Sequence, residues 1–349
     1  MTRLVLLGGG HAHSLVLLKF RKFISKNLEL VLVNAGPVHT YSGMVPGVVA
    51  GHYAVADAQM NLAHLAHDAG AELVQGRVQR LDPGAKQIEL ANGGTLRYDV
   101  ASLNLGSTPA LPDEQSIGVK PFERFMARWR GLLEKGPRQP RIAVVGAGAG
   151  GVELAMAMKF ALAGNGEVIL FSEKNPFPAS VARRIRNALA SRSIELRLGT
   201  PLSALEPGFD AMFWATGAAA VPLLRESGLQ TDERGFVLVD ASLRSLSHPD
   251  VFAAGDNASL AGVALPKSGV TAVRQGAVLA ENLRRIVLGK PMLDYVPQAT
   301  SLSIISCGGK YAIASRGSWS AEGAWAWRWK DWIDRRWIAK FSEETFEVD

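Results

Sequence analysis

The chain has 349 residues, of which 48% are apolar and 20% charged, and it contains one cysteine, Cys307. This composition is typical of globular proteins and excludes disordered and fibrous classes, while the length suffices for two domains. No stretch reaches the roughly 18 apolar residues of a membrane-spanning helix. The opening residues also lack a secretory apolar run, so we expect a cytoplasmic protein. The net charge is +6, and basic residues cluster near residues 183–186 and 328–340. These clusters make an anionic surface a candidate partner.

Two segments of the chain repeat one pattern of strand, glycine turn, helix and strand. In the first, residues 3–7 predict a strand, Gly8-Gly-Gly-His-Ala-His13 a turn, residues 14–23 a helix and residues 28–33 a second strand. In the second, the predicted strand is 141–145, the turn is Gly146-Ala-Gly-Ala-Gly-Gly151, the helix is 152–162 and the next strand is 167–171. Two such copies predict two nucleotide-binding units with parallel sheets.

The glycines fit the needs of a bound pyrophosphate. In such a turn, one glycine permits the tight bend, the next lets the phosphates approach the backbone, and the third brings the helix close to the strand. Gly146, Gly148 and Gly151 fill all three positions, whereas the first turn has Gly8 and Gly10 but His13 in third place. We therefore expect the first helix to lie slightly farther from its strand.

The rest of the chain fits one unit nested in the other. Further strands are predicted at 96–105, 209–215, 235–239 and 251–254, a long helix at 268–286, and a final module with a hairpin from 300–306 to 311–314 and a tryptophan-rich helix. The predicted fold class is α/β, with two Rossmann-like dinucleotide-binding domains and a small C-terminal α+β module. The expected domains are 1–112 with 237–295, the nested 113–236, and the module 296–349.

Four motifs together carry a resemblance to a known family. They are the GGGHAH turn at 8–13, Tyr41-Ser-Gly-Met-Val-Pro-Gly47, Ala215-Thr-Gly217, and Val251-Phe-Ala-Ala-Gly-Asp256. The chain resembles the FAD-dependent pyridine nucleotide-disulfide oxidoreductases over nearly its whole length. The branch it is most similar to is associated with selenide, water dikinase and related to type II NADH dehydrogenases and sulfide:quinone reductases; Leu265-Pro-Lys-Ser-Gly-Val270 and the Trp-Lys-Asp-Trp-Ile-Asp-Arg-Arg336 segment are its other marks.

The resemblance implies where FAD would bind. The first turn would hold the pyrophosphate, Asn34 the adenosine ribose, Val78 the adenine through its backbone, and Asp256 the ribityl chain. Pro46 lies in the loop that would pass the flavin, and the helix starting near Gly269 would aim its positive end at the ring. The cofactor-binding residues implied for FAD are Gly8, Gly10, His11, Ala12, Asn34, Pro46, Val78, Gly106, Gly255, Asp256 and Gly269.

The second turn would hold NADH, with NADPH as the alternative. The implied residues are Gly146, Gly148, Gly151, Glu173 and Gly217. A carboxylate at Glu173 would repel the 2′-phosphate of NADPH, although its offset by one residue and the neighbouring Lys174 weaken that preference. The implied catalytic residues are Glu153, near the nicotinamide, and Lys267, near the flavin; Glu153 could equally begin a helix, and Lys267 could be a solvated lysine.

This sequence departs from the family pattern in three ways. It lacks the paired cysteines of disulfide reductases and the several cysteines of sulfide:quinone reductases. It also lacks the kinase domain of fused relatives. The first turn of the type seen at Ala215-Thr-Gly217 reads Leu105-Gly-Ser107 here. His11 and His13 favour packing or a phosphate contact over acid–base catalysis. His64 and His67 are interpreted as a surface pair and not as a metal site, and Cys307 as a small buried hydrophobe.

The C-terminal helix leaves two interpretations open. Trp325, Trp329, Trp332 and Ile333 share one face, with Arg336 and Lys340 close to it. Tryptophans among basic residues suit a helix lying in a lipid interface, where a quinone would be reached. The same face could instead dock on the protein's own domains or on a second subunit.

The leading hypothesis is an FAD enzyme that takes hydride from NADH and passes electrons to a small acceptor such as a quinone. The alternatives are an FAD enzyme that oxidises a reduced selenium or sulfur compound, and a flavin-bearing partner module of selenide, water dikinase. We expect a homodimer or a monomer that does not bind nucleic acid, located in the cytoplasm or on the inner face of the membrane through its C-terminal helix.

Overall fold

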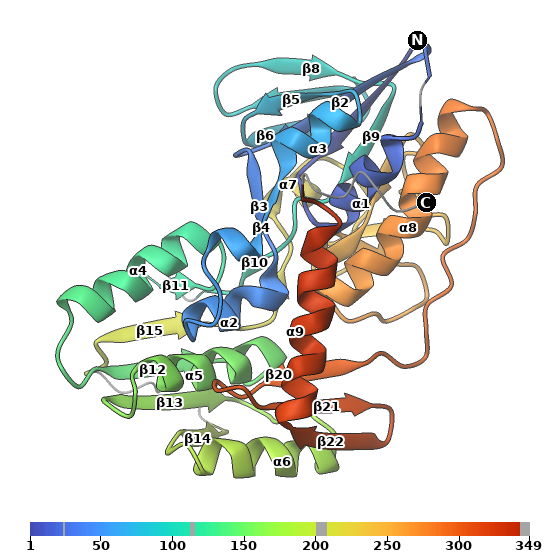
Figure 1. The fold of residues 1–349 in the computed structure, drawn as a ribbon. Helices are drawn as coiled ribbons and strands as arrows, with labels where there is room; N and C mark the ends of the chain where they lie inside the picture. Colours follow the sequence, from blue (N-terminus) through green and yellow to red (C-terminus); the bar gives the residue numbers. More distant parts are fainter. Residues whose placement is uncertain (24, 112–115, 200–207, 343–349) are drawn as a thin grey trace.

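The computed structural model describes the chain except residue 24 and residues 112–115, 200–207 and 343–349. Two five-stranded parallel sheets form its framework (Figure 1). The first has the order β18-β9-β1-β2-β5 and the second β11-β15-β12-β13-β14. The predicted α/β class with two dinucleotide-binding units is therefore confirmed. The expected boundary at 112/113 lies outside the described residues, and the proposed domain limits remain predictions.

The first sheet and its helices are built from the chain before and after the nested unit. Its strands are β1 (Thr2–Leu7), β2 (Leu28–Asn34), β5 (Ala71–Gln75), β9 (Val100–Leu103) and β18 (Val251–Ala253). Helices α1 (His11–Phe20), α3 (Leu62–Asp68) and α8 (Gly269–Val287) accompany them. Short elements in the same region are β3 (Val38–Thr40), η1 (Ser42–Met44), α2 (Val45–Val49), η2 (Ala56–Ala58), β4 (Gln59–Asn61), β6 (Val78–Asp82), β7 (Gln87–Leu90), β8 (Thr95–Arg97), β17 (Val237–Val239), η4 (Gly255–Asn257) and β19 (Ala258–Leu260).

The second sheet belongs to the nested unit. Its strands are β11 (Ile117–Gly118), β12 (Arg141–Val145), β13 (Glu167–Ser172), β14 (Glu195–Leu198) and β15 (Ala211–Trp214), with helices α4 (Phe122–Lys135), α5 (Ala149–Ala161), α6 (Ala179–Ala190) and α7 (Pro222–Glu226) in the same part of the chain. The chain leaves the first unit through β10 (Thr108–Pro109) and returns through β16 (Ala218–Ala219). Because β10 and β16 pair antiparallel, the two crossings lie side by side.

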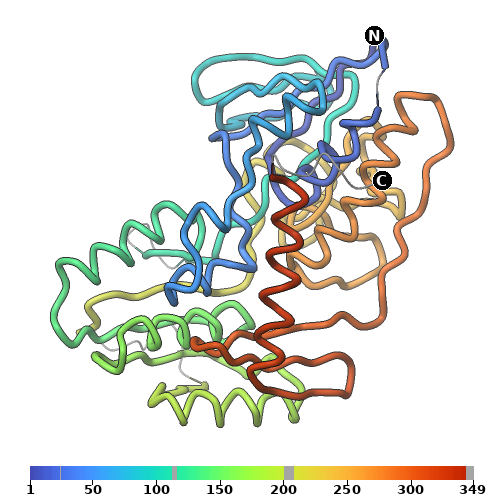
Figure 2. The backbone as a smooth tube through the Cα atoms, in the orientation of Figure 1, coloured from blue at the N-terminus to red at the C-terminus, as the bar shows by residue number. Residues whose placement is uncertain are grey.

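The C-terminal module reaches back across both units. It consists of the antiparallel sheet β20 (Ser303–Ser306), β21 (Ala312–Arg316) and β22 (Trp319–Gly323), followed by α9 (Ala324–Ala339). In Figure 2, α9 is the red helix that rises from the green nested unit toward the blue N-terminal unit. Strand β22 was not predicted, because Trp319 and the residues after it were interpreted as part of the tail.

Several predicted bounds were wrong for physical reasons. Helix α1 begins at His11, directly after Gly10, and not at residue 14 as predicted. It ends at Phe20 rather than at residue 23. The single strand expected over 96–105 is two strands, β8 and β9, which belong to different sheets. Helix α5 likewise begins at Ala149, within its glycine turn, because a pyrophosphate turn is itself the start of the helix.

His13 replaces a third glycine by filling the space between helix and sheet. Its fully buried ring lies within 2.6 Å of the Gly8 carbonyl through Nδ1 and within 2.8 Å of Ser102 Oγ through Nε2. In the second turn, a Cβ atom at Gly151 would collide with the Gly146 carbonyl. The two turns therefore join helix to strand differently: one by an imidazole with two hydrogen bonds, the other by direct backbone contact.

Buried histidines make stability depend on pH. Burial lowers the pKa of His13 to about 4, that of His11 to about 4 and that of His39 to about 3, against 6.5 for an exposed histidine. Between pH 6.5 and 4 the unfolded chain therefore binds protons that the folded chain does not. Stability is complete above pH 6.5 and falls as the pH drops, by up to about 1.4 kcal/mol per pH unit for each histidine.

Denaturant unfolding of the cofactor-free protein at several pH values tests this prediction. His13→Asn should make the dependence shallower below pH 6.5, whereas His67→Asn, whose side chain is 88% exposed, should leave it unchanged. An unfolding free energy that stays constant from pH 6.5 to 4.5 would contradict the burial of neutral histidines.

Candidate functional site

The first glycine turn presents free backbone donors at the start of α1. Gly8 has a φ of +90°, and a Cβ atom there would lie 2.5 Å from the Asn104 carbonyl. No described residue accepts a hydrogen bond from the backbone N–H of Gly10 or of His11. Nε2 of His11 is also buried without a partner among the described residues, and it faces Gly269 at the start of α8. An anionic dinucleotide at this turn would supply these missing acceptors.

Asn104, which sequence reasoning missed, holds the turn in place. Its Oδ1 accepts hydrogen bonds from the backbone N–H groups of Ala12 (3.1 Å) and His13 (3.4 Å), and its Nδ2 donates to the Ala254 carbonyl (2.9 Å). A Cβ atom at Gly255 would lie 2.8 Å from the same Nδ2. One buried amide therefore joins the glycine turn to the Gly255-Asp256 turn.

Asp256 and its neighbours form a polar cluster next to the glycine turn. The Asp256 carboxylate accepts a hydrogen bond from Ser107 Oγ (2.6 Å) and pairs with Lys120 Nζ (3.2 Å). Asn257, a second missed residue, donates to the Gly106 carbonyl (2.6 Å) and accepts from the backbone of Leu105 (2.5 Å). The Leu105-Gly-Ser107 turn and the Gly255-Asp256 turn are thus joined side by side.

The other residues implied for FAD belong to several different elements. The Asn34 side chain accepts from the Gly9 backbone N–H (2.9 Å) and donates to the Gly36 carbonyl (2.7 Å), so its amide is fixed beside the turn. Val78 opens β6, just after Gly76 bonds the Asn34 carbonyl (2.9 Å). Pro46 was expected in a loop but is buried in helix α2, because a proline is well accommodated in the first turn of a helix. Gly269 begins α8, as predicted.

Lys267 points at a carbonyl and an aromatic ring. Its Nζ donates to the Ala258 carbonyl and lies 3.9 Å from the centre of the Phe236 ring. Burial lowers the pKa of Lys267 to about 8, and the charges of Asp232 and Asp256 oppose this shift. The structure therefore places Lys267 close enough to Asp256 to be influenced by its charge.

The second turn has the same form in the nested unit. Gly146 has a φ of +106°, and a Cβ there would lie 2.6 Å from the Ala215 carbonyl; Gly148 precedes α5 and has open space around it. Glu173 is exposed directly after β13, and Gly217 is exposed beside the crossing. The turn therefore has room for a second dinucleotide.

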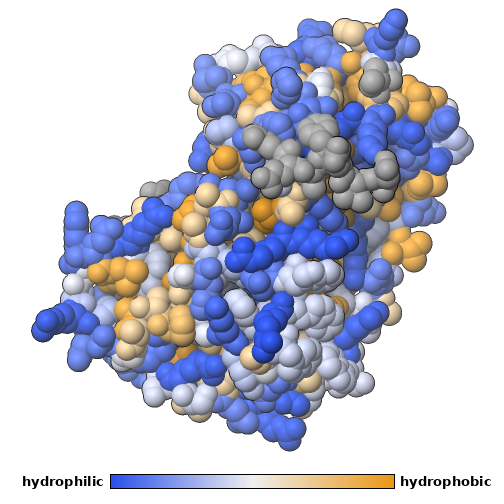
Figure 3. Space-filling model, in the orientation of Figure 1, coloured by the Kyte–Doolittle hydropathy of each residue, from blue (hydrophilic) through white to orange (hydrophobic). Residues whose placement is uncertain are grey.

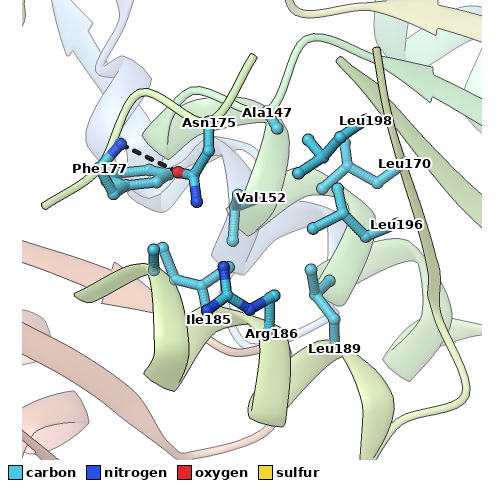
Figure 4. A pocket seen from close by; sticks show the side chains of 11 residues that line it. Ala147, Val152, Leu170, Asn175, Phe177, Ile185, Arg186, Leu189, Leu196 and Leu198 are labelled. Carbon is cyan, nitrogen blue, oxygen red and sulfur yellow. Dashed lines mark hydrogen bonds between the residues drawn. The ribbon is translucent and has the colours of Figure 1, made fainter. Parts of the chain in front are cut away.

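Two cavities lie beside the helices of the two units. One of about 10 Å³, enough for about one water, lies between α6 and the second sheet (Figure 4). Asn175 and Arg186 are its polar lining residues, and Val152, Leu170 and Leu189 are among the apolar ones. Another, of about 220 Å³, lies between Lys19 and Arg284 on α1 and α8. Ala147 of the second glycine turn borders the first cavity, whereas no residue of either turn borders the second.

Glu153 lies where the nested unit meets α9. Its Oε1 accepts a hydrogen bond from the backbone N–H of Ser306 on β20 (2.9 Å). Burial raises the pKa of Glu153 to about 7, and the positive charge of Lys330 opposes the shift. The position thus holds a carboxyl group that exchanges its proton near neutral pH.

Lys330 and Asp334, both missed from the sequence, join Glu153 to the Tyr41 loop. Lys330 Nζ donates to Asp334 Oδ2 (2.8 Å) and to the Gly43 carbonyl (2.9 Å), and the Tyr41 hydroxyl donates to Asp334 Oδ1 (3.0 Å). The Lys330 and Asp334 side chains are 15% and 5% exposed. The only signal in the sequence was their four-residue spacing among the tryptophans.

The tryptophan face of α9 points outward. Trp325, Trp329 and Trp332 are 45%, 38% and 57% exposed, whereas Ala326, Asp334 and Trp337 are buried. The interpretation that this face docks on the protein's own domains is therefore wrong: the face that docks carries Ala326, Trp337 and the Lys330–Asp334 pair. Figure 3 looks onto this side, where pale residues of intermediate hydropathy lie among blue hydrophilic ones. No helix in the described part of the chain is long and apolar enough to span a bilayer.

The remaining candidates hold structural contacts. His64 and His67 both lie against Asp68, at 3.2 and 3.5 Å. Cys307 is buried, and burial raises the pKa of its thiol to about 12. In the basic group at 183–186, Arg184 binds Glu322 (2.7 Å) and Ser320, so it ties α6 to the C-terminal sheet.

Comparison with known proteins agrees with this arrangement. A type II NADH:quinone oxidoreductase of Staphylococcus saprophyticus is 22% identical over 86% of this chain and 87% of that protein. That of Staphylococcus aureus is 24% identical with the same coverage. The structure of the sulfide:quinone oxidoreductase from Aquifex aeolicus superposes with a TM-score of 0.83 at 15% identity, covering 98% of this chain and 91% of that one.

The family model of the pyridine nucleotide-disulphide oxidoreductases matches residues 2–276, which include both glycine turns and the Gly255-Asp256 turn. The cofactors expected from the resemblance, FAD and a nicotinamide dinucleotide, agree with this match. The chain belongs to the pyridine nucleotide-disulphide oxidoreductase family.

Proposed function

We propose that this protein is an FAD-dependent NADH dehydrogenase whose electron acceptor is a quinone. The staphylococcal relatives, which carry that activity in their names, align over most of this chain and support the proposal. Bound FAD would accept a hydride from NADH and pass two electrons onward. The residues present fit both dinucleotides, because each glycine turn offers free space or free backbone donors at the start of a helix.

The residues proposed for FAD are those of the first crevice. The backbone N–H groups of Gly10 and His11 would bind the pyrophosphate, and Asp256 the ribityl hydroxyls. The start of α8 at Gly269 would direct its positive end toward the flavin. For NADH, the proposed residues are those of the second turn, with Glu173 near the adenosine ribose.

The observation that carries the quinone proposal is the chain of polar groups from Glu153 to Tyr41. Reduction of a quinone needs protons as well as electrons, and a group with a pKa near 7 can both release and take up a proton. Glu153 has such a pKa because burial and the Lys330 charge oppose each other. Lys330, whose charge acts on Glu153, also binds the Asp334 carboxylate, and Asp334 in turn accepts a hydrogen bond from the Tyr41 hydroxyl.

Oxidation of a reduced sulfur or selenium compound finds less support. Such chemistry requires a thiolate to carry the chalcogen, and Cys307 is the chain's single cysteine. Its thiol is buried and stays protonated at neutral pH, because burial raises its pKa. A selenide, water dikinase partner remains a prediction of the resemblance.

We further propose that the outward tryptophans dock on a membrane surface, where a lipophilic quinone resides. Trp325 stacks on Trp329 and contacts Trp319, and the Arg336 guanidinium lies 5.4 Å from the Trp332 ring centre. Exposed indoles beside basic residues suit the headgroup region of an anionic bilayer.

Glu153→Gln tests the proton-transfer role. The variant should reduce its flavin with NADH at close to the normal rate, since hydride transfer needs no proton from this carboxyl. Reoxidation by a soluble quinone should slow by roughly 10- to 100-fold and lose the pH dependence centred near 7. Stopped-flow absorbance separates the two half-reactions. Glu322→Gln, a change at a half-buried surface ion pair, is the control.

If quinone reoxidises the Glu153→Gln protein as fast as the normal protein at every pH, Glu153 does not deliver the proton. If quinone fails to reoxidise the normal protein reduced by NADH, the quinone proposal itself is wrong.

Replacing Trp325, Trp329 and Trp332 together by serine tests the membrane proposal. Because these side chains are exposed, the unfolding temperature should change little. Cosedimentation with anionic phospholipid vesicles should fall at least several-fold, while turnover with a soluble quinone should persist. Equal vesicle binding by both proteins would show that another surface is used or none.

A further inference from the structure

Lys120 connects the nested unit to the crevice of the first unit. It lies between β11 and α4, next to Val119, whose backbone N–H donates to the Trp214 carbonyl of the second sheet (3.1 Å). Its side chain leaves that sheet and places Nζ 3.2 Å from Asp256 Oδ2 and 3.2 Å from Ser107 Oγ. A residue anchored in one unit therefore brings a positive charge to the crevice of the other.

The two partners of the Lys120–Asp256 ion pair differ in their exposure to solvent. The Asp256 side chain is 15% exposed and that of Lys120 is 46% exposed, so the carboxylate is fixed while the ammonium group retains access to solvent. The Ser107 hydroxyl already donates to the same carboxylate oxygen. Asp256 therefore keeps a partner if the ammonium group shifts, and the lysine is free to serve another anion nearby.

The surroundings of Lys120 favour such an anion. His11, the first residue of α1, and His39 beside it both feel the Lys120 charge, which contributes to their low pKa values. These two histidines are therefore neutral and give no positive charge to the glycine turn. Lys267, the other lysine near Asp256, donates instead to the Ala258 carbonyl and covers Phe236.

FAD carries two negative charges on its pyrophosphate, and its ribityl chain would lie against a third, on Asp256. Such a set of like charges close together is unfavourable without a cation among them. We propose that Lys120 is a cofactor-binding residue whose ammonium group provides the counter-charge for the FAD pyrophosphate. The proposal uses the FAD crevice of the proposed function but does not depend on NADH or on the electron acceptor.

Binding of FAD and of riboflavin to the cofactor-free protein separates the possible roles. Riboflavin has the ribityl chain and ring but no phosphate. Lys120→Met should weaken FAD binding at least ~10-fold in low salt and change riboflavin binding by less than ~2-fold, and Lys120→Arg should restore most of the FAD affinity. Quenching of flavin fluorescence measures both. The loss should shrink as salt rises from about 0.01 to 0.1 M, where screening takes over.

Lys135→Met provides a matched control, because Lys135 is an exposed lysine at the end of the neighbouring α4. Its FAD and riboflavin affinities should equal those of the unmodified protein. If Lys120→Met does not fold, as judged by circular dichroism, Lys120→Gln is compared with Lys120→Arg in its place.

The same measurements in the Asp256→Asn background provide the decisive comparison. If Lys120 acts on the phosphates, Lys120→Met still weakens FAD binding there. If it acts only as the partner of Asp256, the effect disappears in that background, or FAD and riboflavin weaken equally, and the proposal is overturned. FAD affinity unchanged by Lys120→Met in both backgrounds would overturn it too, while the NADH and quinone assays would still judge the proposed function separately.

Discussion

The geometry of the site depends on one buried amide, that of Asn104 at the end of β9. Its oxygen accepts from two backbone N–H groups in the first turn of α1, and its nitrogen donates to the Ala254 carbonyl. Without it, these buried backbone groups would have no partner, at a cost of about 1 to 3 kcal/mol for each group left unsatisfied. The amide also explains why Gly10 and Gly255 must be glycines, since a Cβ at either position would meet the Asn104 side chain.

Helix α9 joins the C-terminal module to the Tyr41–Gly43 segment of the first unit. Its inward face carries the Lys330–Asp334 pair, which binds the Tyr41 loop and lies in electrostatic contact with Glu153. A buried ion pair is expensive to desolvate and is retained only where its charges serve position or chemistry. The outward face carries tryptophans that the protein does not cover. In the proposed function, this one helix would link the Glu153 carboxyl group to a membrane-facing surface.

The sequence predicted the parts of the fold that local patterns encode. Short glycine motifs predicted both turns, and the periodicity of apolar residues predicted the strands of the two parallel sheets and the start of α8. The expected strand at 96–105 failed because Tyr98 and Asp99 separate residues of two different sheets, which only tertiary pairing decides. The helix starts were placed too late because the glycine turn was interpreted as preceding the helix instead of opening it.

The site was harder to predict than the fold, for a related reason. Asn104, Lys120, Lys330 and Asp334 act through partners far away in the sequence, as the contact of Lys120 with Asp256 shows. No spacing rule marks the contacts of Asn104 and Lys120, and the four-residue spacing of Lys330 and Asp334 does not indicate their contacts with Gly43 and Tyr41. The tryptophan stripe left two interpretations open, because an apolar period does not say what covers it. The structure buries another face of α9, which carries Ala326, Trp337 and Asp334, and Tyr41 provides a partner for Asp334.

In the proposed function, the first glycine turn and Asp256 hold a flavin that NADH reduces. Anaerobic titration of the purified, FAD-loaded protein with NADH, followed by visible absorbance, tests it most directly. The account predicts that the yellow flavin band bleaches stoichiometrically with added NADH. Protein that stays colourless after incubation with FAD, or bound flavin that remains oxidised in excess NADH, would contradict it.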